Sequence, residues 1–216
     1  RSTLFPYTTL FRSTNRSIYA LGMETISSDT ACYPAKLVHG HIEWLVKEGE
    51  KFIFYPCINY EKIEDRNAQN HYNCPIVATY PEVVANNMGE LFAAERVDFM
   101  HPFLPYDDEN RLTEELIKHI GEPFSIPADE IAEAVSEAGR EAERFKADMR
   151  RSGEQVLEYL EKTGKKGIVL AGRPYHIDPE INHGIDRVIE SFDMAVLTED
   201  TVGRSEERRV GKECRS

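Results

Sequence analysis

An α/β fold with a parallel sheet is predicted by three features of this 216-residue chain. Short apolar runs typical of strands, at residues 51–55, 167–171 and 194–198, alternate with segments of helical periodicity, and the run 51–55 is expected to be a buried strand. In the last third, a helix over 181–192 separates two strands, which predicts a βαβ unit. Residues 129–162 place apolar side chains three and four positions apart, which indicates one long helix. We therefore expect a Rossmann-like parallel sheet with flanking helices and one long helix, in incomplete domains.

The other elements follow from local signals. A helix is expected over 34–48, directly after Cys32, because its apolar residues recur on one face. Residues 81–88 indicate another helix, and Gly164 is expected to end the long one. The stretch 59–73 is polar and without period, a loop of the length usually found at functional sites.

Both ends of the chain read as translated DNA of technical origin. Residues 3–13 and 204–214 can be back-translated into one oligonucleotide and its reverse complement, which is typical of sequencing-adapter DNA, and the ends concerned are residues 1–13 and 204–216. We therefore exclude them, together with Cys214, from the expected fold. The segment between them is expected to be a slice of a longer gene product.

That internal segment divides into two predicted parts: residues 14–126, a cysteine-bearing α/β segment, and residues 127–203, the long helix plus the βαβ unit. The net charge is −12, and the excluded ends carry seven Arg and Lys against three Glu, so the internal segment is near −16. Such acidity argues against binding to nucleic acid or to anionic membranes. No apolar run approaches the ~18–20 residues that span a bilayer. A cytoplasmic protein is expected.

Three cysteines stand next to or near prolines in loop-like surroundings. Cys57 follows the first predicted strand, Cys32 precedes a helix whose dipole favours a thiolate, and Cys74 ends the polar loop. An odd number of thiols is poorly suited to disulfides but could hold an iron–sulfur cluster with one iron left open. Their spacings match no zinc knuckle or ferredoxin motif, and small buried thiols are the alternative interpretation.

A second cluster of polar residues lies at 172–184, between a predicted strand and helix. Arg173 and Tyr175 are candidates for holding an anionic coenzyme, and His176 and His183 for moving a proton. The alternatives are a loop that merely caps the next helix, or a divalent-metal site whose spacing matches no recognised motif. His39 and His41, after Cys32, could support a cluster or be ordinary core-edge histidines.

These motifs carry a resemblance to a known family. They are Cys32-Tyr33-Pro34, Tyr55-Pro56-Cys57, Asn73-Cys74-Pro75 and Gly172-Arg173-Pro174-Tyr175-His176. With their flanks, they resemble the acyl-CoA dehydratase activase-related family, the large proteins linked to 2-hydroxyglutaryl-CoA dehydratase and its activator. In full-length relatives such a segment follows duplicated ATPase domains and is similar to dehydratase subunits, which carry an oxygen-sensitive 4Fe-4S cluster. The resemblance implies Cys32, Cys57 and Cys74 as cluster ligands.

The function implied by the resemblance is an iron–sulfur-dependent component of 2-hydroxyacyl-CoA dehydration, or of its ATP-driven reductive activation. One electron would pass to an acyl-CoA thioester, in a lyase-type system with activase or dehydratase subunits as partners. The sequence has no Gly-rich phosphate loop, so ATP is expected only through other domains. The alternative is a non-catalytic docking or scaffold domain with a dehydratase-like fold, whose cysteines are structural or bind zinc.

Overall fold

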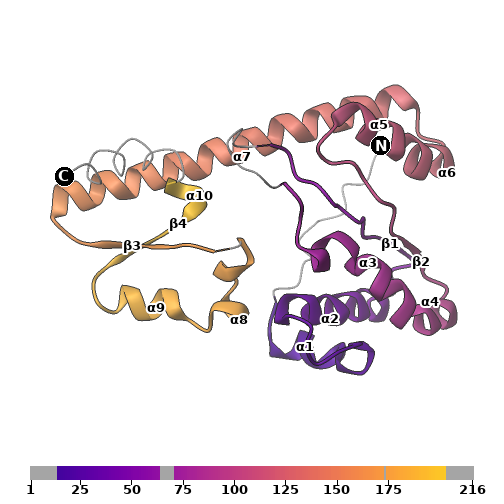
Figure 1. Cartoon of the computed structure of the whole chain (residues 1–216), viewed down its shortest axis with the longest axis horizontal. Coiled ribbons are helices and arrows are strands. Elements are labelled where there is room, and N and C mark those ends of the chain that lie inside the picture. Colours follow the sequence, from indigo (N-terminus) through magenta and orange to yellow (C-terminus); the bar gives the residue numbers. More distant parts are fainter. Residues whose placement is uncertain (1–13, 64–70, 173, 203–216) are drawn as a thin grey trace. The chain divides into compact units, whose positions relative to one another are not determined.

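The computed structural model describes residues 14–63, 71–172 and 174–202, and the chain forms two compact units, Arg1–Ser136 and Glu137–Ser216. Each unit contains helices and one two-stranded parallel sheet (Figure 1). The α/β class is therefore confirmed. Because each sheet has two strands among the described residues, the larger Rossmann-like sheet stays a prediction.

The first unit is mainly helical around the sheet β1–β2. Its elements are α1 (Arg16–Leu21), the 3-10 helix η1 (Met23–Thr25), α2 (Tyr33–Lys47), β1 (Phe52–Phe54), α3 (Pro75–Asn87), α4 (Gly89–Glu95), β2 (Asp98–Met100), α5 (Glu109–Leu116), the π-helical turn η2 (Ile117–Gly121), α6 (Glu122–Phe124) and the start of α7 (Ala128–Thr163). In the parallel pairing, Ile53 lies opposite Phe99. The main core comprises Ala35, Ile42, Val46, Ile53, Tyr80, Val84, Met88, Phe92 and Val97.

Two predictions for this unit need correction. The helix expected to start at residue 81 begins at Pro75, because a proline in the first helical turn loses no hydrogen bond and is already in a helical conformation. Pro81 lies inside that helix instead. The run 51–55 was expected to be a buried strand, yet in β1 only Ile53 is buried, while Phe52 and Phe54 are exposed.

Helices α1 and α2 cross at backbone contact. A Cβ atom on Gly40 would overlap the carbonyl oxygen of Ile18, and one on Gly22 would overlap the backbone of His39 and Gly40. Ile18 has no exposed surface. Asn15 caps α1, since its Oδ1 accepts hydrogen bonds from two backbone N–H groups of the first turn. Because they lack a side chain, Gly22 and Gly40 allow close contact between α1, which precedes the Cys32 segment, and α2, which follows it.

The second unit contains the rest of α7, β3 (Gly167–Leu170), the 3-10 helix η3 (Pro174–Ile177), α8 (Pro179–Asn182), α9 (Ile185–Glu190), β4 (Ala195–Thr198) and α10 (Glu199–Val202). Strands β3 and β4 pair in parallel, which confirms the βαβ unit. Helix α7 matches the predicted long helix and ends at Gly164, whose φ is +69°. The helix predicted over 181–192 is two short helices, because His183 and Gly184 adopt left-handed backbone conformations.

The predicted adapter-derived ends, 1–13 and 204–216, lie outside the described residues, and so do residues 64–70 of the polar loop. The described ends of that loop meet in an antiparallel bridge between Tyr60 and Tyr72, whose ring centroids are 4.2 Å apart. Among the described residues, no helix has the length and apolar character needed to cross a membrane.

Candidate functional site

Cys57 continues the parallel ladder beyond β1. Its N–H donates to the carbonyl of Pro102 at 2.8 Å, and its carbonyl accepts from the N–H of Leu104 at 2.9 Å. Its side chain is fully buried. Burial raises the pKa of the Cys57 thiol, and the nearby carboxylate of Glu82 raises it further, whereas a hydrogen bond from the backbone N–H of Glu82 lowers it. Cys57 is thus the protonated, enclosed member of the three predicted ligands.

Cys32 and Cys74 occupy equivalent positions at helix starts. Each is the residue before the first helical one, Cys32 for α2 and Cys74 for α3, and neither side chain makes a capping hydrogen bond. Both are free thiols, Cys32 exposed and Cys74 half-buried. The structure therefore confirms the helix start expected after Cys32, and it adds one after Cys74, where the sequence placed the helix start at residue 81.

Two tyrosines, the buried Tyr80 and the half-buried Tyr55, lie near Cys32 and Cys57. Burial raises the pKa of Tyr80, and Cys32 raises it further. Burial, followed by Cys57 and then Tyr80, raises the pKa of Tyr55 to about 12. Tyr80 is therefore near Cys32, and Tyr55 is near both Cys57 and Tyr80. Among the described residues, however, no three Cys, His, Asp or Glu side chains form a group that could hold a metal ion.

His39 is buried between Thr25 and Tyr80. It has no exposed surface, and its Nδ1 lies 2.9 Å from Oγ1 of Thr25 while its Nε2 lies 3.0 Å from the hydroxyl of Tyr80. Both ring nitrogens are therefore satisfied by hydroxyl groups. Burial lowers the pKa of His39, so the folded protein keeps this ring neutral.

We expect the stability of the protein to fall in acid partly through His39. Its pKa in the unfolded chain is the ordinary 6.5 and is lower in the folded protein. The unfolded state therefore binds more protons below pH 6.5, and stability is lost as the pH falls from there toward the folded value. Urea unfolding between about pH 8 and pH 5 should show a shallower loss for His39→Gln than for the parent protein. Parallel pH curves for the two proteins would contradict this.

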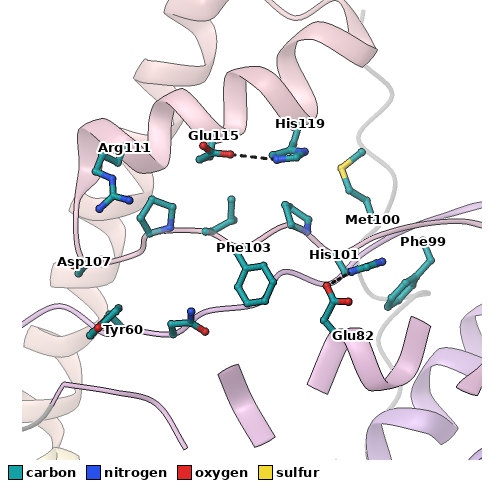
Figure 2. A pocket seen from close by; sticks show the side chains of 14 residues that line it. Tyr60, Glu82, Phe99, Met100, His101, Phe103, Asp107, Arg111, Glu115 and His119 are labelled. Atoms are coloured by element: carbon teal, nitrogen blue, oxygen red, sulfur yellow. Dashed lines mark hydrogen bonds and ion pairs between the residues drawn. The ribbon is translucent and has the colours of Figure 1, made fainter. Parts of the chain in front are cut away.

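A cavity of about 710 Å³ lies at the carboxyl ends of β1 and β2 (Figure 2). Two histidine–glutamate pairs line it: Nδ1 of His101 is 2.9 Å from Oε1 of Glu82, and Nε2 of His119 is 3.3 Å from Oε2 of Glu115. The carboxylate of Glu82 also raises the pKa of the Cys57 thiol, so one residue both lines the cavity and acts on the buried cysteine. Ligands of parallel sheets commonly bind at this edge.

Local structure explains how these side chains face the cavity. Asp108 caps α5 by accepting from the N–H groups of Asn110 and Arg111. Arg111, Glu115 and His119 then follow at intervals of four, and Figure 2 shows them along one edge of the helix, opposite the segment that carries His101. This segment begins immediately after β2.

The polar loop of the second unit is built differently. His176 lines a small cavity of about 30 Å³ at the carboxyl ends of β3 and β4, and its ring lies 4.6 Å from that of Tyr175. Asp178 caps α8 by accepting from two backbone N–H groups, as the capping interpretation predicts. His183 is exposed at the end of α8 and is not among the residues that line this cavity. Arg173 lies outside the described residues.

One protein-family model matches nearly the whole chain. The model of the CoA enzyme activase uncharacterised domain matches residues 8–202, a range that includes the three cysteines, the cavity and the polar loop. The chain belongs to this family. The acyl-CoA dehydratase activase relationship inferred from the motifs is confirmed, and membership supports a role in the activase and dehydratase system. No curated protein and no solved structure matches the chain.

Sequence reasoning missed the cavity residues of this activase-family domain. Glu82 and His101 were not proposed, because the strand that precedes His101 has only three residues, Asp98–Met100. The spacing of four between Arg111, Glu115 and His119 was the one usable signal, since it places three chemically active side chains on one helical face.

Proposed function

We propose that this activase-family domain is an iron–sulfur-dependent component of 2-hydroxyacyl-CoA dehydration or of its ATP-driven reductive activation. The observation that supports it is the setting of Cys32, Cys57 and Cys74: three free thiols in one unit, two at helix starts and one at a strand end. A 4Fe-4S cluster, when bound, supplies one-electron transfer, here to an acyl-CoA thioester.

The cysteines as placed do not yet form a ligand set, so cluster binding requires two changes. The three sulfurs must converge, and the thiol of Cys57 must ionise against the effect of its burial. The backbone N–H of Glu82 favours that ionisation, because it donates a hydrogen bond to the sulfur of Cys57.

In the second unit, we propose that Arg173 and Tyr175 hold the coenzyme of the thioester and that His176 and His183 transfer protons. The support is the position of His176 at the carboxyl ends of β3 and β4, the edge where such ligands bind. Activase or dehydratase subunits would be the protein partners, and ATP would act through their domains.

Anaerobic reconstitution with iron and sulfide tests the cluster. We expect about four iron and four sulfide per chain, with a brown colour, in the parent protein. Replacing Cys32, Cys57 or Cys74 singly with alanine should remove most of the iron, because a cluster with three protein ligands tolerates the loss of none. Cys214→Ala is the matched control and should keep the parent iron content. Full iron content in any one of the three single variants would contradict this ligand set.

A docking or scaffold domain is the second candidate function. It is favoured by the lack of a ready metal-binding group among the described side chains. On this alternative, the anaerobically purified protein would be colourless, and metal analysis would find zinc or no metal. It would still associate with dehydratase subunits after alanine replaced all three cysteines.

A further inference from the structure

The cavity at the carboxyl ends of β1 and β2 carries more negative than positive side chains. Among the described residues that line it, three are carboxylates, Glu82, Asp107 and Glu115, and one, Arg111, is a guanidinium. Figure 2 shows the carboxylates on different parts of the wall, because one comes from α3, one from α5 and one from the segment before α5. The cavity therefore favours a ligand that carries separated positive charges.

Two of these carboxylates act on neighbouring acidic groups. The pKa of the Cys57 thiol is raised first by burial and then by Glu82. The pKa of the Tyr60 hydroxyl is raised chiefly by its hydrogen bond with Tyr72, and Asp107 raises it further. A negative potential has this effect, because it disfavours the loss of a proton. The same potential favours the binding of an ammonium group.

The wall between the carboxylates is apolar and partly aromatic. It is formed by Phe99, Met100, Pro102, Phe103, Leu104 and Pro105. Figure 2 shows the ring of Phe103 in the middle of this wall, and its side chain is exposed. Aromatic rings attract ammonium groups, and methylene groups pack against apolar side chains. The volume of about 710 Å³ is in the range of sites that enclose small organic ligands.

We propose that this cavity binds an aliphatic polyamine, in which methylene chains join two or more ammonium groups. One ammonium group donates hydrogen bonds to Glu82, another donates to Asp107 or Glu115, and the methylene chain packs against Phe103. Arg111 opposes the binding, because it has the same charge as the ligand. A bare metal ion would leave the apolar wall unused, and the described side chains offer no group of three that could hold one. This site goes beyond the proposed function, since it needs neither a cluster nor a coenzyme.

The test is a titration of the full chain followed by NMR, with four probes: spermidine, butylamine, adipate and magnesium chloride. It is done at low salt and at about pH 8, where histidine side chains are ordinarily neutral and add acceptors without positive charge. We expect spermidine to bind with a dissociation constant of about 0.1–1 mM. Butylamine has one ammonium group and should bind at least about tenfold more weakly. Adipate, an anion of comparable length, and magnesium should not displace spermidine at equal concentration.

Variants assign the binding to this cavity. Glu82→Gln and Asp107→Asn should each weaken spermidine binding about three- to tenfold, the effect of losing a charge-assisted contact. Arg111→Gln should tighten it about threefold, because a like charge is removed, and a misfolded variant cannot produce such a gain. Glu48→Gln removes the same unit of charge at the exposed end of α2, outside the cavity lining. It is the matched control and should bind spermidine as the parent protein does.

Several results would overturn the proposal. The absence of saturable spermidine binding up to about 50 mM is one, and equal affinity for butylamine and spermidine is another. Tighter binding of adipate or magnesium would show that the site selects an anion or a metal ion. An equal loss in Glu48→Gln and Glu82→Gln would show attraction to the acidic surface as a whole, and unchanged or weaker binding in Arg111→Gln would place the polyamine elsewhere. Iron content is a separate measurement, so failure here is distinguishable from failure of the cluster.

Discussion

Gly40→Ala is expected to destabilise the first unit by about 3 kcal/mol or more. The new Cβ would overlap the backbone carbonyl oxygen of Ile18, and a backbone atom gives way far less readily than a flexible side chain. Either α1 leaves α2, which exposes the fully buried Ile18, or α2 shifts and carries Cys32 and His39 with it. Urea unfolding of the full chain, monitored by circular dichroism, measures the loss.

Gly89→Ala is the control in the same unit. Gly89 is the first residue of α4, and a Cβ there meets no atom within 4 Å. Alanine should leave stability unchanged or raise it by up to about 1 kcal/mol, since it restricts the unfolded chain. If both variants unfolded at the same urea concentration as the parent protein, the close crossing of α1 and α2 would be refuted.

Gly153→Ala should similarly separate α10 from α7 in the second unit. Its Cβ would overlap the carbonyl oxygen of Thr201, so we expect a loss of about 2–3 kcal/mol. Gly139→Ala lies on the same helix and meets no atom within 4 Å. There, alanine should raise the stability of the helix by about 1 kcal/mol. One substitution on one helix thus has opposite effects at two positions.

Thermal unfolding of the two variants measures the contrast. The midpoint should fall for Gly153→Ala and rise slightly for Gly139→Ala. A fall of equal size in both would mean that packing at α10 contributes nothing and that α7 simply tolerates no change. Proteolysis near β4, faster only in Gly153→Ala, would locate the effect.

The elements that sequence could predict are those with long periodic patterns. Helix α7 matches its prediction within a residue at each end, because thirty-six residues of helical period leave little ambiguity. The break at His183 was missed because left-handed conformations are unusual for histidine, although Gly184 next to it is a usual helix end. Pro81 misled the prediction for α3, since a proline more often starts a helix than interrupts one.

Less of the candidate site than of the fold could be predicted from the sequence. The positions of Cys32 before a helix and of Cys57 after a strand followed from local signals, and the structure bears them out, whereas the helix start at Cys74 was missed. The cavity did not follow from such signals, because His101 and Arg111 reach it only after β1 pairs with β2 across more than forty residues of chain. Pairing of two three-residue strands is a property of the packed core, and no local pattern encodes it.

The two-stranded sheets also affect how the protein must be handled. Each strand pairs on one side with its partner, and the described residues place no further strand beside either sheet. The outer edges of β1 and β2 thus have no strand partner among the described residues, and β1 carries the partly exposed rings of Phe52 and Phe54. Such edges recruit strands from other molecules. Dilute protein and low temperature should therefore limit aggregation during purification, and a lysine at Phe52 or Phe54 is the change most suited to suppress it.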